Sequence, residues 1–133
     1  MMRRRDPRRR AAAVVEFAVV LPLLITILFG IIEYGWVFMV RQALQTAARE
    51  GARVGTLQTA TEAQVLARVT DVMAPTGLTP SFTFQDATAV DPEVRVSLSV
   101  QYSDVSLLGD FFNHGSGALG GVCSMRKEGW VPP

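Results

Sequence analysis

The chain has 133 residues, one cysteine, one histidine and a formal net charge of +1, which leave room for one domain and exclude most enzymes. The charge is unevenly placed, because the first ten residues hold six arginines against one aspartate, and residues 11–133 therefore carry a net charge of −4. Residues 11–40 contain only two charged side chains, Glu16 and Glu33, so part of the chain is not globular.

The long apolar run after the arginines predicts a membrane span. From Phe17 to Ile32 there are 16 residues without a charge, and the apolar character continues to Val40. The core of a secretory signal has about 7–15 residues, whereas a span needs about 20. A buried core helix of this length would have nothing large enough to cover it. We therefore expect a single span, with the arginines in the cytoplasm and the rest of the chain outside.

Within the span, Pro22 is expected to bend the helix by removing one backbone hydrogen bond. Glu16 and Glu33 would lie about 26 Å apart along a helix, close to the ~30 Å thickness of the hydrocarbon layer. The two glutamates thus bracket the apolar core, and Glu33 is expected in the outer interface. The far end carries an aromatic cluster typical of that interface, formed by Tyr34, Trp36 and Phe38.

The helical pattern continues beyond the membrane. Apolar or small residues recur at spacings of three and four and form one stripe; they are Val37, Val40, Leu44, Ala47, Gly51 and Val54. A row of small residues, Ala47, Gly51 and Gly55, would allow another backbone to approach closely. Two interpretations stay open, packing against helices of other subunits and packing against the chain's own domain.

A second helix is expected after a polar stretch. Thr61 is a suitable N-cap, with Glu62 near the positive end of the helix. One face would be apolar, formed by Ala63, Leu66, Val69, Val72 and Met73. Proline and glycine residues end the helix, at Pro75, Gly77 and Pro80.

The period then changes to two, which predicts an antiparallel sheet of about three strands. The first strand contains Phe82 and Phe84, and the clearest one runs from Val94 to Tyr102, with Asp86–Pro92 as the hairpin loop between them. A last strand is expected at Gly121–Lys127. Residues 103–118 are irregular, although four apolar residues there should be buried, namely Leu107, Leu108, Phe111 and Phe112.

Residues for catalysis are scarce, and we predict no catalytic, cofactor or metal site. His114 stands alone in a glycine-rich loop, and no nucleophile triad, metal-ligand spacing or phosphate-binding loop is present. The basic leader is better explained by membrane orientation and anionic lipid than by nucleic acid. Cys123 has no partner for an internal disulfide; it is either a small buried thiol or the site of an intermolecular bridge.

Glu16 is the informative residue, because a carboxylate in a span is costly and usually has a partner. Arg9 and Arg10 are candidate partners within the intact chain. Proteolysis between Ala11 and Ala12 would create another, an α-ammonium four residues before Glu16, that is, one helical turn away. In a staggered stack of helices, that ammonium would also reach the glutamate of a neighbouring subunit.

These residues resemble a prepilin processing site: a basic leader, a small residue at Ala11, four apolar residues, and then Glu16-Phe17. With the following apolar helix and the segment Gln42–Arg53, the chain closely resembles the TadE-like pseudopilins of the Flp/Tad (type IVb) pilus system. The resemblance is strong over residues 10–55, and the end of the chain, Ser124–Glu128, is similar as well. The family commonly has glycine where this chain has Ala11.

The resemblance implies cleavage by a prepilin peptidase, a role for Glu16 and Phe17 in recognition or assembly, and membership of an adhesive pilus as a minor subunit. The expected partners are the peptidase, other pilins and pseudopilins, the inner-membrane assembly proteins and the lipid bilayer. The predicted α+β organisation is a leader at 1–11, a pilin-like transmembrane and amphipathic helix at 12–56, and a small extracytoplasmic head at 57–133. Helix packing is assigned to Pro22, Ala47, Gly51 and Gly55.

An unprocessed, permanently anchored extracytoplasmic binding or assembly protein is the alternative function. A second acid at the outer end of the span, Glu33, is compatible with either reading. A membrane-anchored enzyme would need a polar constellation that the sequence does not contain.

Overall fold

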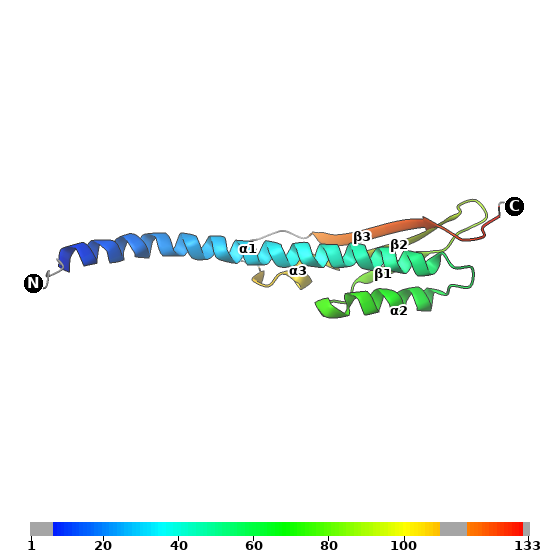
Figure 1. The fold of residues 1–133 in the computed structure, drawn as a ribbon, viewed down its shortest axis with the longest axis horizontal. Helices are drawn as coiled ribbons and strands as arrows, with labels where there is room; N and C mark the ends of the chain where they lie inside the picture. The colour runs from blue at the N-terminus through cyan, green and yellow to red at the C-terminus, as the bar shows by residue number, and fades with distance from the viewer. Residues whose placement is uncertain (1–6, 110–116, 132–133) are drawn as a thin grey trace, which may run out of the picture.

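The computed structural model describes residues 7–109 and 117–131. The elements in chain order are α1 (Pro7–Gly55), α2 (Glu62–Met73), the 3-10 turn η1 (Ala74–Thr76), β1 (Ser81–Gln85), β2 (Glu93–Gln101), α3 (Tyr102–Val105) and β3 (Ala118–Arg126). Figure 1 shows a long rod, α1, with all other elements gathered along its C-terminal half, and with the start of α1 and the segment after β3 at opposite tips. The α+β class, with a long helix before a small head, is confirmed.

Helix α1 begins earlier than the sequence pattern indicated. The helix was expected at 12–56, after a leader at 1–11, but it already includes Pro7 and Arg10. Proline is well suited to the first turn, because the N–H that it lacks has no partner there, and arginine is a good helix former. Residues 1–6 of the leader lie outside the described part of the chain.

Pro22 does not interrupt α1, which is a single helix of 49 residues. The hydroxyl of Thr26 donates to the carbonyl of Pro22 at 2.8 Å. In Figure 1 the helix curves gently over its first half and does not break. The expected bend is therefore a mild curvature.

The sheet is antiparallel, with strand order β1-β2-β3. Alternate residues of β2 are buried, as the period of two predicted; they are Val94, Val96, Leu98 and Val100. In the register, Phe84 lies opposite Val96, and Cys123 lies opposite Val96 on the other side. One face of the sheet therefore packs on the helices, and the other carries residues such as Arg95 that remain exposed.

Helix α2 has the predicted N-cap, and its buried face agrees in part with the predicted one, because Val69 and Met73 are buried and Val72 is partly buried. The hydroxyl of Thr61 accepts from the Gln64 N–H, and the Gln64 side chain accepts from the Thr61 N–H, which completes a capping box. The buried residues are Val65, Val69 and Met73, whereas Ala63 and Leu66 are exposed. The C-terminal part of the predicted stripe is therefore confirmed, whereas in the first turns Val65 is buried in place of Ala63 and Leu66.

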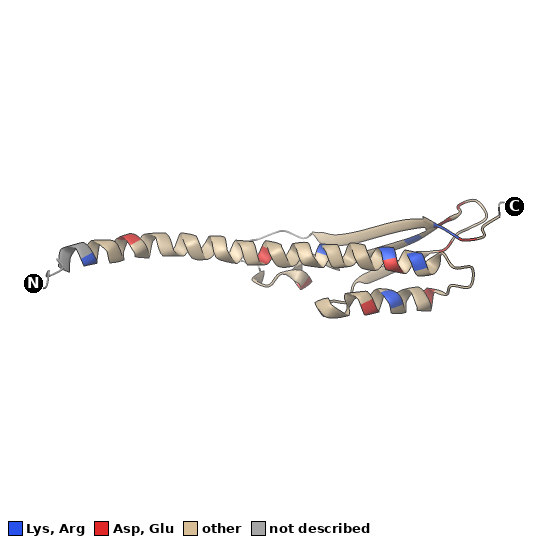
Figure 2. Ribbon diagram, in the orientation of Figure 1, with Lys and Arg blue, Asp and Glu red and all other residues tan. Residues whose placement is uncertain are grey.

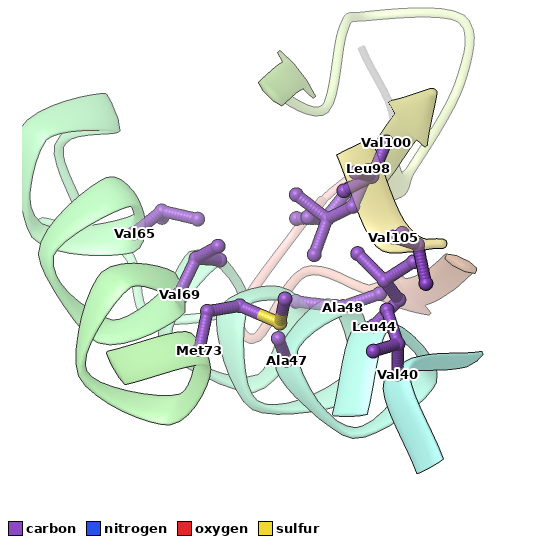
Figure 3. Close-up of a cluster of buried hydrophobic side chains, with 12 residues drawn as sticks. Val40, Leu44, Ala47, Ala48, Val65, Val69, Met73, Leu98, Val100 and Val105 are labelled. Carbon is purple, nitrogen blue, oxygen red and sulfur yellow. The ribbon is translucent and has the colours of Figure 1, made fainter. Parts of the chain in front are cut away.

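The core lies between α1, α2 and the sheet. Figure 3 shows Ala47 of α1 beside Met73 of α2, and Val40 and Leu44 of α1 on the side of Val105 and Leu98. The predicted stripe of α1 supplies these contacts, because Val40, Leu44, Ala47 and Gly51 are buried. Of the two interpretations left open by the sequence, the structure shows packing against the chain's own head.

Three glycines permit close approach in this core. A Cβ at Gly51 would lie 2.8 Å from Val69 Cγ2, and one at Gly55 would lie 2.8 Å from Val94 Cγ1. A Cβ at Gly121 would lie 2.6 Å from both the backbone C and O of Leu44. The backbones of α1 and β3 are thus in direct contact where they cross.

The ends of the strands differ by a few residues from the predicted ones. The hairpin loop Asp86–Pro92 is confirmed, but β2 stops at Gln101 and Tyr102 opens the short helix α3. Strand β3 begins at Ala118, three residues earlier than predicted. Leu107 was expected to be buried and is 56 % exposed, and Leu108 is only partly buried. The predictions for Phe111, Phe112 and His114 fall outside the described residues.

The C-terminal segment bonds to α1 and to the hairpin loop at the end of the head that is farthest from the N-terminal half of α1. The N–H of Glu128 donates to the Thr56 carbonyl at 2.9 Å, just after α1 ends. Lys127 Nζ lies 2.5 Å from Asp86 Oδ1 in the hairpin loop, and Trp130 Nε1 donates to the Thr88 carbonyl at 3.0 Å. These bonds join three chain segments at one tip.

Candidate functional site

The first half of α1 stands apart from the rest of the molecule. All side chains from Arg10 to Phe29 are exposed, and most are large and apolar. Figure 2 shows this stretch without charge between Glu16 and Glu33, whereas charges recur on the second half of the helix. Within the described residues, α1 is the helix that is long and apolar enough to cross a membrane. Exposed apolar surface of this extent requires lipid or protein to cover it.

The predicted processing site lies at the start of this bare helix. Ala11, Ala12, Glu16 and Phe17 are all helical and exposed, with Phe17 at 59 %. Residues four apart lie on the same face of a helix, so Glu16 is placed one turn above Ala12. The geometry leaves Glu16 accessible to a partner from outside the chain.

Glu33 has a different environment, one that sequence reasoning did not find. Its exposed fraction is 0 %, although it lies among exposed residues of α1. The Ser106 hydroxyl donates to Glu33 Oε1 at 2.6 Å, and the N–H groups of Leu107 and Leu108 donate to Oε2 at 3.1 and 3.2 Å. A buried carboxylate with three donors is well satisfied, since such bonds replace those that it loses to water.

A second bond holds the same loop to α1. Trp36 Nε1 donates to the carbonyl of Val105 at 2.9 Å, one residue before Ser106. Burial of the Tyr102 side chain raises the pKa of its hydroxyl, and the nearby negative charge of Glu33 adds to the increase. Glu33 and Trp36 therefore fix α3 and the loop that follows it at the level where the head begins.

The helix-packing residues predicted from the sequence are separated by the structure. Ala47, Gly51 and Gly55 are buried in the head, and Pro22 lies alone on the exposed half of α1. The apolar surface of α1 that remains open to other helices therefore lies before residue 40 in the sequence.

A chemical site is not evident in the described part of the chain. No group of three or more metal-ligating side chains is found among the described residues. Cys123 is a half-buried thiol of β3 without a disulfide.

A family model described as TadE-like protein matches residues 11–53, which lie wholly within α1. Over this segment the chain is similar to the TadE-like family. No curated protein and no solved structure matches it. The TadE-like family is a structural family associated with the Tad pilus, and it is not an enzymatic one.

The match explains the exposed apolar half of α1 better than it explains the head. A long apolar helix in a pilus-associated family fits a membrane-anchored protein that associates with pilus components. The match includes Glu16, Glu33 and Trp36, and it stops before α2 and the sheet. The head therefore has to be interpreted from its own contacts.

The Glu33 site could have been suspected from one signal. An acid at the end of a span, followed by Tyr34 and Trp36, has few local partners on its own helix. Its donors come from residues more than 70 positions later, and two of the three are backbone N–H groups, which carry no sequence signature. Pairing at that distance is not readable from one sequence.

Proposed function

We propose that this chain is a minor pilin or pseudopilin of the Tad pilus. It is a structural, non-catalytic subunit, held in the cytoplasmic membrane by α1 with its N-terminus inside and its head outside. A prepilin peptidase removes the leader, and the assembly machinery then passes the subunit into an adhesive filament. The units of this account are the leader at 1–11, the helix at 12–56 and the head at 57–133.

One observation carries the proposal: a single helix is bare over its first half and built into a head over its second half. The family match falls on this helix. A bare apolar rod needs lipid before assembly and the helices of other pilins afterwards, whereas a soluble head can leave the membrane with it. This division suits a subunit that is transferred from a bilayer to a filament.

Glu16 and Phe17 are assigned to processing and assembly, together with the Ala11–Ala12 bond. Glu16 is exposed on the bare half, so its partner would be supplied by another molecule or by a new N-terminus. A carboxylate costs about 2.5–3.5 kcal/mol at the bilayer centre on insertion scales, which favours a counter-charge once the subunit is assembled.

The deciding measurement is the mature N-terminus, determined by mass spectrometry on protein taken from assembled pili. We expect Ala12 to be the first residue. Protein that retains Met1 or Met2 in filaments would refute processing.

A pair of variants tests Glu16 itself. Glu16→Ala should insert into the membrane as well as or better than the natural chain, because it removes a charge, and it should enter pili less. Val15→Ala is the matched control, since Val15 is a neighbouring exposed residue of the same helix. Equal incorporation of both variants would contradict the pairing role.

A second function is favoured by one feature of α1. The helix begins at Pro7, so the Ala11–Ala12 bond lies inside helical backbone, which is a poor protease substrate until it unwinds. A permanently anchored, unprocessed extracytoplasmic binding or assembly protein would have this geometry. It predicts an intact leader on chains isolated from the membrane and no chain in the filament.

A further inference from the structure

The apolar surface of α1 does not end at Glu33. Because that carboxylate is fully buried and bonded by the loop, the next exposed charge along the helix is Arg41. The distance from Glu16 to Arg41 is about 37 Å along a helix, longer than the ~30 Å hydrocarbon layer and within the ~40–45 Å of the whole bilayer. The uncharged surface of α1 is therefore long enough to reach past the level of Glu33 within a bilayer.

Exposed apolar side chains continue along the stretch of α1 between Glu33 and Arg41, hereafter the band. Tyr34 is 60 % exposed, Phe38 63 % and Met39 47 %. Leu107 is 56 % exposed on the loop that caps Glu33, and its N–H bond to the carboxylate places it beside the helix at the same level. The head therefore adds a large apolar side chain to the band formed by α1.

Beyond this band the surface of α1 changes from apolar to charged and polar, as a phospholipid changes from acyl chain to headgroup. A hollow on α1 is lined by Phe38, Arg41, Gln42 and Gln45, so an aromatic side chain is followed within two turns by a guanidinium and two amides. Aromatic side chains favour the interface between acyl chains and headgroups, and arginine binds phosphate. The surface is continuous with the apolar half of α1, and this continuity favours lipid as the occupant.

We propose that the loop Ser106–Gly109 is a membrane-docking element of the head, which inserts Leu107 into the outer interface while Glu33 and Trp36 hold it in place. Glu33 has two effects in this arrangement: it positions the loop, and it is itself removed from lipid. The head is then seated on the bilayer at a defined height and does not swing on α1. The inference rests on the membrane anchoring within the proposed function, and it is independent of leader cleavage.

The test uses the full chain in nanodiscs of phosphatidylcholine and phosphatidylglycerol, with Cys123→Ser as the background. Single cysteines that carry an environment-sensitive fluorophore replace Leu107, Leu24 or Val90. Leu24 lies in the bare half of α1, and Val90, 92 % exposed in the hairpin loop, is the matched exposed control in the head. Quenching is measured with spin labels placed near the headgroup or deep in the acyl chains.

We expect the shallow label to quench the fluorophore at Leu107, the deep label to quench it at Leu24, and neither to quench it at Val90. Quenching at Leu24 with none at Leu107 overturns the docking element and leaves the anchor intact. Absence of quenching at both sites overturns both proposals. A third outcome is a fluorophore at position 107 that is shielded from water but quenched by neither label, and that becomes exposed when each disc holds one chain. This outcome would identify a second copy of the chain as the occupant, and it would also overturn the docking element.

A second measurement tests the role of Glu33 in positioning. Glu33→Ala on the Leu107 reporter should lose most of its shallow quenching and keep quenching at Leu24. Glu16→Ala is the matched control, because it removes an exposed glutamate from the same helix, and it should leave the Leu107 signal unchanged. Quenching at Leu107 that survives in Glu33→Ala would overturn the positioning role.

Discussion

The two halves of α1 belong to one helix but have different surroundings. From Arg10 to Ile32 almost every side chain is exposed, and the charge at Glu16 faces outward. From Glu33 to Gly55 one stripe of the helix is buried by the head, and Glu33 receives three donors. Glu16 is thus exposed in the half that needs a partner from another molecule, whereas Glu33 is hydrogen-bonded in the half that packs against the head.

The comparison teaches where the stability of each half originates. The second half is stabilised by burial against α2 and the sheet, so changes in the head should act on it strongly. The first half has no contacts of that kind and depends on its solvent or on other subunits. Variants of the head should therefore leave membrane insertion unchanged, and variants of the bare half should leave unfolding of the head unchanged.

The largest effect is expected for Gly121→Ala, where α1 and β3 cross. The new Cβ would lie 2.6 Å from backbone atoms of Leu44, which cannot move without shifting the helix. Overpacking typically costs about 1–3 kcal/mol, and contact with backbone favours the upper end. Thermal unfolding of the purified chain in detergent measures the loss.

Gly120→Ala is the control for that variant. Its Cβ would meet the Leu98 carbonyl at 3.4 Å, an ordinary contact, and the residue is exposed. A stability similar to that of the natural chain is expected. Equal losses in both variants would show that any side chain weakens β3 and that the crossing is not special.

The next effect sharpens the contrast between the two glutamates. Glu33→Ala leaves the N–H groups of Leu107 and Leu108 and the Ser106 hydroxyl without their acceptor, which should cost the head about 1–3 kcal/mol. Hydrogen exchange at the two amides should become fast. Glu16→Ala should change neither quantity, and protection of the amides that persists in Glu33→Ala would contradict the assigned geometry.

A smaller effect, confined to the head, is expected for Thr61→Ala. The variant removes one half of the capping box at the start of α2, and loss of such a cap costs typically about 1 kcal/mol. Thr59→Ala, in the exposed turn just before, should have little effect on unfolding. Thr61→Ala should also enter membranes as the natural chain does, because α2 lies outside the bare half of α1.

Much of this contrast was predictable from the sequence. The charge-free run Phe17–Ile32 indicated the bare half, and the stripe from Val40 to Gly51 indicated the face that the head covers. Periodicity reports local geometry, and α1, α2 and the three strands were therefore found with small errors at their ends. Val65 was missed because neighbouring faces of α2 are almost equally apolar.

The tertiary links were not predictable in the same way. The capping of Glu33 depends on how a loop more than 70 residues later folds back on α1, and the contact of Gly121 with Leu44 depends on the angle between a helix and a strand. Neither relation leaves a periodic signal. Ala47, Gly51 and Gly55 show the limit clearly, since a row of small residues indicates close approach but not which molecule approaches.

The smallest effect concerns the hydroxyl of Tyr102, whose pKa is influenced by the buried Glu33. The pKa of its hydroxyl is raised above 10.0 by burial first and by Glu33 second, so the folded head favours the neutral phenol. Below pH 10 both folded and unfolded chains hold the proton and stability is unaffected; above it the unfolded chain ionises first, and stability falls as the pH rises toward the folded pKa. The chain has two tyrosines, so in Tyr34→Phe the absorbance of tyrosinate reports Tyr102 alone. We expect its titration above 10 in that variant and closer to 10 when Glu33→Gln is added, because the amide removes the charge. A midpoint at or below 10 with Glu33 present would contradict the burial of the phenol, and a midpoint that Glu33→Gln leaves unchanged would show that the carboxylate does not act on Tyr102.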